Sequence, residues 1–343
     1  MTVVPRWLRR HAWKLVGCAL SLLLVYLAFR KVDWAAMGAA LRQANYWLLL
    51  AGAVVGLGGF VVRAVDWKYL LAPVGTFPAL RLFPPVAIGY MANNLLPARM
   101  GEFVRAYVVG RREGVSKSSA LATILVERIF DGLTLLLILA VVSIFFDFPQ
   151  WVKVGGFMVA AVFIGLSGFL AVVAVKLAFG LRMLEITLGR WVPGAAERMK
   201  SRLTCFVAGL DIARHGRHAL LAGLACMARW VFEACIYLSV VLAMGLDVPV
   251  HGVLFVMVVV NIAAMVPSAP GYVGPVQIGC VVSLAVFGVD ETRAAAYSLL
   301  LHAAIFLPIT FAGLVCFVRE NMTLAALQRP NDAPVAATAP PEN

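Results

Sequence analysis

Three charged side chains and two amides interrupt an apolar stretch near residue 100. Residues 93–105 read Asn-Asn-Leu-Leu-Pro-Ala-Arg-Met-Gly-Glu-Phe-Val-Arg. A charge at the depth of the bilayer core costs about 2.5–3.5 kcal/mol on insertion scales, so such groups face protein or a cavity. Arg99, Glu102 and Arg105 lie three residues apart and share one helical face. We interpret them as a phosphate clamp in which Glu102 holds the arginines in place, with a self-neutralising surface patch as the alternative.

A second set of charges falls inside an apolar span that begins near residue 120. Glu127 and Asp131 are four residues apart and face the same way on a helix, and Arg128 can pair with Asp131. That pair accounts for only one of the two carboxylates. The other carboxylate carries a proton or pairs with one of three arginines, Arg99, Arg105 or Arg229.

Other polar side chains lie nearer the ends of apolar spans or alone within them. Arg229 with Glu233, four residues apart, repeats the spacing of a helical ion pair, and Arg63 is followed by Asp66. Near a span end such pairs are interpreted as snorkelling or structural. His302 stands alone in an apolar stretch, where it is either a hydrogen-bonded core residue or a proton relay.

Residues 267–275, Pro-Ser-Ala-Pro-Gly-Tyr-Val-Gly-Pro, contain too many helix breakers for a continuous helix. Their backbone groups are exposed, and Tyr272 and Gln277 add donors. We interpret the segment as the tip of a hairpin rather than a plain loop, because its flanks are short and apolar. The hairpin breaks are assigned to Pro97, Gly101, Pro267, Pro270, Gly271 and Gly274.

The composition defines the class of protein. Of 343 residues 62% are hydrophobic and 13% are charged, whereas a soluble domain is about 45–50% apolar. The sequence therefore predicts an all-α polytopic membrane protein. The net charge of +12 comes from basic residues in short loops, as in cytoplasmic loops that face anionic lipid, and it does not indicate nucleic-acid binding.

The apolar stretches predict about six full spans and two re-entrant helical hairpins. The spans are placed at 15–29, 47–62, 120–146, 154–179, 220–244 and 294–318. The predicted organisation is a basic cytoplasmic N-terminus (1–14), a first membrane repeat (15–180) with a hairpin at 82–110, a cytoplasmic amphipathic linker (181–217), a second repeat (218–320) with a hairpin at 252–287, and a disordered tail (321–343).

The two halves share a pattern. Pro97-x-x-x-Gly101 recurs as Pro267-x-x-x-Gly271, and asparagines precede both breaks, at Asn93 and Asn94 in the first half and at Asn261 in the second. The loop charges place the halves in opposite orientation, so we predict an inverted repeat with its site at the midplane. Chance recurrence of Pro-x-x-x-Gly is the alternative.

The motifs at 93–105, Glu-Arg-x-x-Asp at 127–131 and Pro-Ser-x-Pro-Gly-x-x-Gly at 267–274 together resemble the lysylphosphatidylglycerol synthase transmembrane-region family, also called the flippase-like domain family. The resemblance covers about residues 15–318. It implies that a lipid-headgroup path is lined by Arg99, Glu102, Arg105, Glu127, Arg128 and Asp131. The soluble aminoacyl-transfer domain of the two-part members is not found here, so lysyl transfer is not expected.

We expect a flippase or scramblase-like transporter that moves an anionic phospholipid or glycolipid between leaflets. No Gly-x-x-x-x-Gly-Lys-Ser/Thr loop, Asp-x-Asp pair or Gly-x-Ser-x-Gly turn occurs, so we expect no enzyme, no cofactor and no metal. The expected substrate-binding residues are Asn93, Asn94, Arg99, Glu102, Arg105, Glu127, Arg128, Asp131, Arg229, Glu233, Asn261, Tyr272, Gln277 and His302.

Two alternatives remain open at this point. One is a membrane-embedded lipid headgroup or glycosyl transferase, and the other is an accessory partner of a lipid-biosynthetic enzyme. The expected partners are an anionic membrane lipid and the bilayer, with a homo-oligomer left open. The expected location is the bacterial inner membrane, with both termini cytoplasmic.

Overall fold

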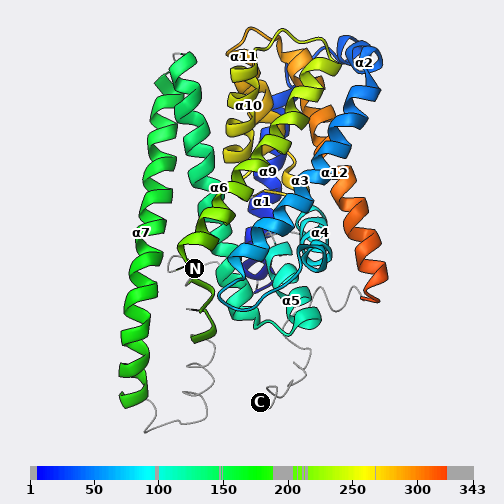
Figure 1. Ribbon diagram of the computed structural model, residues 1–343. Coiled ribbons are helices and arrows are strands. Elements are labelled where there is room, and N and C mark those ends of the chain that lie inside the picture. The colour runs from blue at the N-terminus through cyan, green and yellow to red at the C-terminus, as the bar shows by residue number, and fades with distance from the viewer. Residues whose placement is uncertain are drawn as a thin grey trace.

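The computed structural model is built of helices throughout its described part, which comprises residues 6–96, 100–146, 148, 150–187, 204–206, 208–210, 212, 215–266 and 268–322. Figure 1 shows them as one bundle with α7 at its edge. The helices are α1 (Arg6–Phe29), α2 (Trp34–Gln43), α3 (Tyr46–Leu70), α4 (Ala79–Leu95), α5 (Gly101–Glu113), α6 (Lys117–Phe145), α7 (Gln150–Thr187), α9 (Gly216–Ala243), α10 (Val250–Ala263), the short 3₁₀ helix η3 (Pro270–Tyr272), α11 (Pro275–Ala285) and α12 (Glu291–Arg319).

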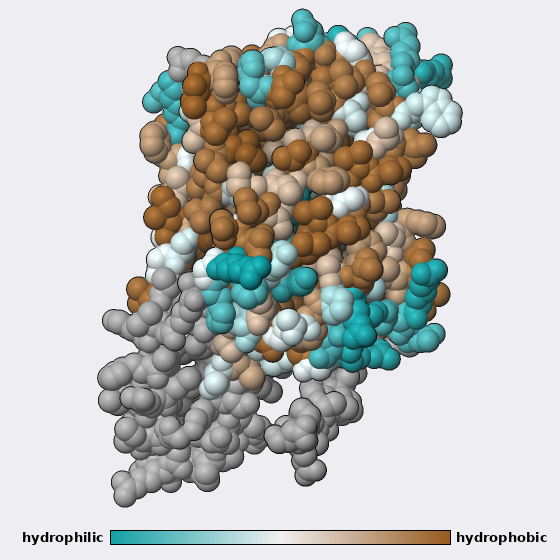
Figure 2. Space-filling model, viewed as in Figure 1, coloured by the Kyte–Doolittle hydropathy of each residue, from teal (hydrophilic) through white to brown (hydrophobic). Residues whose placement is uncertain are grey.

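Five helices in the described part are long and apolar enough to cross a membrane, namely α3, α6, α7, α9 and α12. The sixth expected span is α1, whose apolar stretch within those residues, Gly17–Phe29, is shorter. Figure 2 shows a broad apolar band across one face, with hydrophilic residues gathered above and below it. The chain is therefore an all-α polytopic membrane protein, as its composition predicts.

Two helices run further than the sequence indicates. The span expected to end at residue 62 continues to the end of α3 at Leu70, so Arg63 and Asp66 lie inside a helix and are buried. The charged residues do not terminate the helix, because this part of α3 packs against other helices that supply partners such as Glu127 for Arg63. Likewise α7 continues to Thr187, into the expected linker 181–217, most of which lies outside the described residues together with 323–343.

Glycines set the contact between the two halves of the chain. The contact of α3 with α9 is the most extensive between any two helices of the described part. Gly52, Gly56 and Gly59 of α3 face Ser239, Ile236 and Phe232 of α9, and a Cβ atom at any of the three would lie closer than ordinary contact. Small residues on one helical face let two membrane helices approach closely. The pairing brings Arg63 and Arg229 into the same interior.

The same order of elements occurs twice. A span, α3, is followed by the helix pair α4–α5 and the span α6. In the second half α9 is followed by α10–η3–α11 and then by α12. In Figure 1 the α4–α5 pair lies in the lower half of the bundle and the α10–α11 pair in the upper half. The orientation of the two halves in a membrane stays a prediction.

The ends of the two helix pairs meet inside the bundle. Helix α4 contacts η3, and the carbonyl oxygen of Asn94 lies 3.4 Å from the Cβ position that a side chain at Gly271 would have. Gly271 has φ of +75°, a conformation that favours glycine. The expected breaks at Pro97 and Pro267 fall outside the described residues, whereas Gly101, Pro270, Gly271 and Gly274 lie in or beside the turns that join the paired helices.

Candidate functional site

A cavity of about 210 Å³ lies where the spans meet the ends of the helix pairs. It draws residues from both halves of the chain. Its charged and hydrogen-bonding lining consists of Arg63, Tyr90, Asn93, Asn94, Glu102, Arg128, Asp131, Arg229, Trp230, Glu233, Tyr237, Asn261, Tyr272 and His302.

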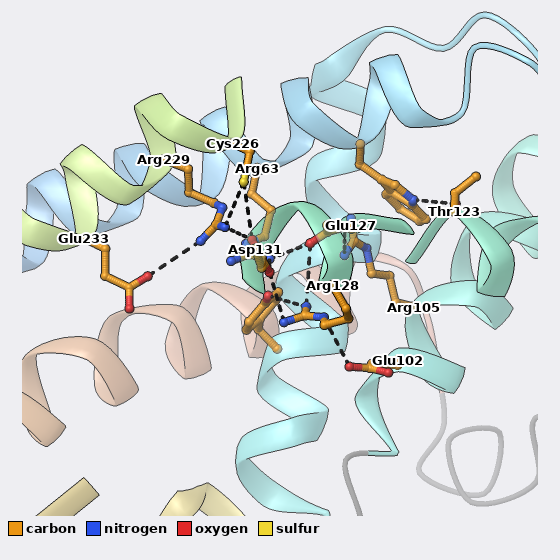
Figure 3. Close-up of polar contacts among 12 residues, drawn as sticks. Arg63, Glu102, Arg105, Thr123, Glu127, Arg128, Asp131, Cys226, Arg229 and Glu233 are labelled. Carbon is orange, nitrogen blue, oxygen red and sulfur yellow. Dashed lines mark hydrogen bonds and ion pairs between the residues drawn. The ribbon is translucent and has the colours of Figure 1, made fainter. Parts of the chain in front are cut away.

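Two carboxylates of α6 organise the arginines around this cavity. Glu127 has no solvent exposure and forms ion pairs with Arg63 of α3 at 2.5 Å and with Arg105 of α5 at 2.7 Å. Asp131, one turn later, pairs with Arg229 of α9, and it lies 3.6 Å from Arg63. Figure 3 shows these side chains converging from separate helices. Both carboxylates are therefore paired with arginines.

Weaker ion pairs extend the cluster to the edge of the cavity. Arg128 lies 3.3 Å from Asp131 and 3.4 Å from Glu102, and its guanidinium donates a 2.9 Å hydrogen bond to the hydroxyl of Tyr90. On the opposite side Arg229 lies 3.7 Å from Glu233. The expected spacing pairs Arg128–Asp131 and Arg229–Glu233 are therefore both present.

Aromatic rings cover the guanidinium groups of two buried arginines, Arg105 and Arg63. The guanidinium of Arg105 lies 3.8 Å from the ring centroid of Trp67, and that of Arg63 lies 4.7 Å from the ring of Tyr90. The indole N–H of Trp67 in turn donates to Thr123 at 3.0 Å. Stacking on an aromatic face stabilises a desolvated cation, so these contacts fix the guanidinium planes.

Several guanidinium nitrogens in the cluster are buried without a hydrogen-bond acceptor in the described part of the chain. They are Nε of Arg128, Nε and Nη1 of Arg229, and Nε and Nη2 of Arg105. Nε of Arg128 and Nη1 of Arg229 lie within ion-pair distance of Glu102 and Glu233 but make no hydrogen bond with them. Two of these arginines, Arg128 and Arg229, line the cavity. Buried donors are normally satisfied, so an acceptor-rich anion in the cavity fits this arrangement.

Amides and a histidine line the cavity on the side of the second half. Asn261 donates to Glu233 at 3.0 Å, to the hydroxyl of Tyr237 at 3.3 Å and to a backbone carbonyl of its own helix at 3.0 Å. His302 Nδ1 lies 3.1 Å from Nε2 of Gln277. His302 is thus hydrogen-bonded, and it also borders the cavity.

The two asparagines of α4 hold the neighbouring elements. Asn93 accepts a 2.8 Å hydrogen bond from the backbone N–H of Gly101, where α5 begins. Asn94 donates to the hydroxyl of Thr310 in α12 at 2.8 Å. Both also line the cavity.

The structure brings most of the expected site residues to one place. Ten of them line the cavity: Asn93, Asn94, Glu102, Arg128, Asp131, Arg229, Glu233, Asn261, Tyr272 and His302. Glu127 and Gln277 do not line the cavity but contact the lining residues Arg63 and His302, and Arg105 pairs with Glu127. Arg99 lies outside the described residues.

Two expectations about individual contacts are wrong. Glu102 pairs with Arg128 of α6 and does not hold Arg105, whose carboxylate partner is Glu127. Arg63 makes no ion pair with Asp66 in the described part of the chain; it is 5% exposed and pairs with Glu127, which fits the structural interpretation and not the snorkelling one. The sequence feature that indicates a buried Arg63 is its position directly after an apolar stretch, because the helix of that stretch continues past it to Leu70.

The cavity defines a class of protein: a helical membrane protein whose interior holds a charged cavity of about 210 Å³ built by both halves of the chain. The model of the lysylphosphatidylglycerol synthase TM region matches residues 14–313, and the chain belongs to this family. No solved structure matches the chain.

Curated relatives are archaeal. The chain is 28% identical to Glycosyltransferase AglD of Haloferax volcanii over 91% of its own length and 55% of that protein, so it spans about half of this relative. It is 27% identical to a UPF0104 membrane protein of Methanothermobacter thermautotrophicus over 75% of its length and 80% of the relative. A second UPF0104 membrane protein of that organism is 23% identical, over 88% of this chain and 93% of the relative.

The similarity to AglD corrects the expectation that the protein is not an enzyme. A relative that matches nearly the whole chain carries the name of a glycosyltransferase, which points to an enzyme. The three motifs that the sequence lacks are those of nucleotide, metal and nucleophile sites in soluble domains, so their absence does not exclude chemistry on a lipid inside the membrane.

Proposed function

We propose that the protein binds the phosphate of an anionic phospholipid or glycolipid in the cavity and moves this headgroup between the two leaflets. The acyl or prenyl tails would stay in the surrounding lipid. We place the protein in the cytoplasmic membrane, with both termini on the cytoplasmic side, following the basic loops.

The observation that carries the proposal is the set of buried guanidinium nitrogens at the cavity that make no hydrogen bond in the described part of the chain. Nε of Arg229 has no carboxylate partner there, and Nε of Arg128 and Nη1 of Arg229 have only the long ion pairs with Glu102 at 3.4 Å and with Glu233 at 3.7 Å. A phosphate presents several acceptor oxygens and forms charge-assisted hydrogen bonds with planar guanidinium groups. The arginines are held by Asp131 and Glu127, so they are oriented before the ligand arrives.

The position of the cavity supports translocation as well as binding. Its lining comes from the spans α3, α6, α9 and α12 and from the ends of both helix pairs. Broken helices that meet near the midplane form the substrate site of many transporters built from repeats. A headgroup bound there would reach either leaflet by movement of one helix pair.

The test is lipid translocation by the purified protein in liposomes. A fluorescent phosphatidylglycerol is placed in both leaflets, and a membrane-impermeant reductant quenches the outer leaflet. We expect wild-type protein to expose the inner-leaflet lipid and Arg229→Gln to abolish this. Arg81→Gln, which removes an exposed arginine 3.8 Å from Glu113, is the matched control and should keep activity. Equal rates for wild type and Arg229→Gln would refute the proposal.

The second candidate is glycosyl transfer to or from a lipid phosphate held in the same cavity. The observation that favours it is the similarity to Glycosyltransferase AglD over 91% of the chain. A phosphate oxygen of the lipid would attack the anomeric carbon of a nucleotide sugar, and the nucleoside diphosphate would leave. Carboxylates beside the phosphate site, such as Glu233 and Glu102, would accept hydrogen bonds from the sugar hydroxyls and orient the sugar.

Product formation separates the two candidates. Purified protein is incubated with a polyprenyl phosphate and radiolabelled nucleotide sugars, and the lipid fraction is extracted and counted. Labelled lipid that disappears in Glu233→Gln supports transfer. Translocation without labelled product supports the first candidate.

A further inference from the structure

We propose that Asp66 of α3 is a proton-binding site of the charged cluster, and that a phosphate in the cavity strengthens its hold on the proton. The second half rests on the proposed function, and the first half does not. Asp66 lies one helical turn after Arg63 and has 0% exposure. Both of its carboxylate oxygens are buried without a hydrogen-bond partner, and no ion pair joins them within the part of the chain that the structure describes.

The contrast with the other buried carboxylates is direct. Glu127 and Asp131 are each held by at least two arginines. Arg63, on the same helix as Asp66, turns toward Glu127 instead. An ionised carboxylate without water or a donor is strongly disfavoured in an apolar interior, whereas the neutral acid is tolerated. The geometry therefore suits a protonated Asp66.

A charge count supports the same state. Among the described residues, the cluster contains four arginines, Arg63, Arg105, Arg128 and Arg229, and four carboxylates in ion pairs with them, Glu102, Glu127, Asp131 and Glu233. These charges cancel without Asp66. An ionised Asp66 would leave one uncompensated negative charge inside the membrane, and a proton removes it.

The groups that act on Asp66 come from α3 itself and from α5, α6 and α9. Those that interact with it electrostatically are Arg63 on its own helix, Arg105 of α5, Glu127 of α6, and Arg229 and Cys226 of α9. Of the other helices that pack on α3, α4 places Tyr90 over Arg63 and α12 places His302 at the cavity. Each of the three arginines is paired with Glu127 or Asp131, so its charge is already compensated.

A phosphate would change this balance. Bound to Arg128 and Arg229, it adds negative charge to a cluster that is neutral while Asp66 is protonated, and this added charge makes loss of the Asp66 proton less favourable. Binding of proton and phosphate would then be mutually favourable, because linkage is reciprocal. The lipid phosphate and the proton would move together.

Infrared titration of the purified chain in detergent tests the proton site without any transport. A protonated carboxyl group absorbs apart from a carboxylate and apart from the amide bands. We expect a protonated-carboxyl band at neutral pH that is lost in D66N and shifted in D66E. The matched control is D247N, which removes an exposed carboxylate between α9 and α10 and should leave the band unchanged.

Dihexanoyl phosphatidylglycerol is then added as the soluble probe. We expect the titration midpoint of this band to rise by about one pH unit, a tenfold gain in proton affinity. A band that persists unchanged in D66N and D66E, or no band at neutral pH, overturns the proton site. A midpoint that does not move with the probe overturns the coupling.

The result is separable from that of the lipid assay. If the band depends on Asp66 but wild-type protein moves no lipid, the proposed function fails and the proton site stands. If lipid translocation requires Arg229 while no Asp66 band exists, the proton site fails alone. Where D66N does not yield folded protein, D66E keeps the carboxyl group and the band shift alone decides.

Discussion

Arg63 and Glu127, 64 residues apart in the chain, are joined by an ion pair of 2.5 Å that fastens α3 to α6 beside the cavity. Arg63 is 5% exposed and Glu127 is fully buried. Glu127 also holds Arg105, so a single carboxylate fixes arginines from two other helices. The charged cluster that holds the candidate phosphate site therefore also joins α3 and α5 to α6.

Glu127→Gln should therefore destabilise the protein. Two buried arginines lose their anionic partner, and breaking a buried ion pair typically costs about 3–5 kcal/mol. Thermal unfolding in detergent, followed by circular dichroism, measures the change. The control is Glu291→Gln, which breaks the exposed pair with Lys31 and should cost less than about 1 kcal/mol. Equal unfolding temperatures for the two variants would contradict this role of Glu127.

Gly101→Ala should weaken the α4–α5 pair. The added Cβ would overlap the carbonyl oxygen of Gly89 and press on the side chain of Asn93, whose amide oxygen accepts from the N–H of Gly101. Gly38→Ala in α2 is the control, because nothing lies within 4 Å of its Cβ position. We expect a lower unfolding temperature for the first variant, and an unchanged or slightly higher one for the second. A Gly101→Ala protein as stable as wild type would show that the two helices separate easily.

Gly271→Ala tests whether the end of the second helix pair shapes the cavity. Gly271 and Gly288 both have φ of +75°, so alanine strains the backbone equally at both positions. Only Gly271 lies against Phe306 and Asn94, whereas the Cβ position of Gly288 is open. We expect Gly271→Ala to lose far more lipid translocation than Gly288→Ala, measured in the same liposome assay. Similar losses in both would assign the effect to backbone strain alone.

Trp67 should act on Arg105 through its ring. Trp67→Phe keeps an aromatic face under the guanidinium and removes the hydrogen bond to Thr123, whereas Trp67→Leu removes both. A buried cation–π contact is worth about 2 kcal/mol, so the leucine variant should be the less stable by roughly that amount. Unfolding in detergent measures the difference. If the two variants unfold together, the hydrogen bond to Thr123 carries the stability.

Much of the fold could be predicted because it is local. The spans expected at 220–244 and 294–318 correspond to α9 and α12, whose ends differ by only a few residues from these limits. Apolar stretches of that length leave few alternatives to a helix. The end of α3 was missed because Arg63 is compensated by Glu127, a partner that only the folded chain brings near.

The candidate site was predictable to a similar extent. Arg128 with Asp131 and Arg229 with Glu233 follow from helical spacing, and both pairs are found. Contacts between distant helices do not follow from spacing. Glu102 was assigned to Arg105 on its own helix, yet its ion-pair partner is on α6. The sequence also does not reveal that Asp66 lacks a partner among the described residues, because this depends on Arg63 pointing toward Glu127.

The central claim is that the arginines at the cavity receive a phosphate, and direct binding tests it. Titration of purified protein with dihexanoyl phosphatidylglycerol, followed by calorimetry, gives the affinity for wild type, Arg229→Gln and the surface control Arg81→Gln. We predict at least tenfold weaker binding for Arg229→Gln, about 1.4 kcal/mol, and wild-type affinity for Arg81→Gln. Identical affinities for wild type and Arg229→Gln would contradict the claim.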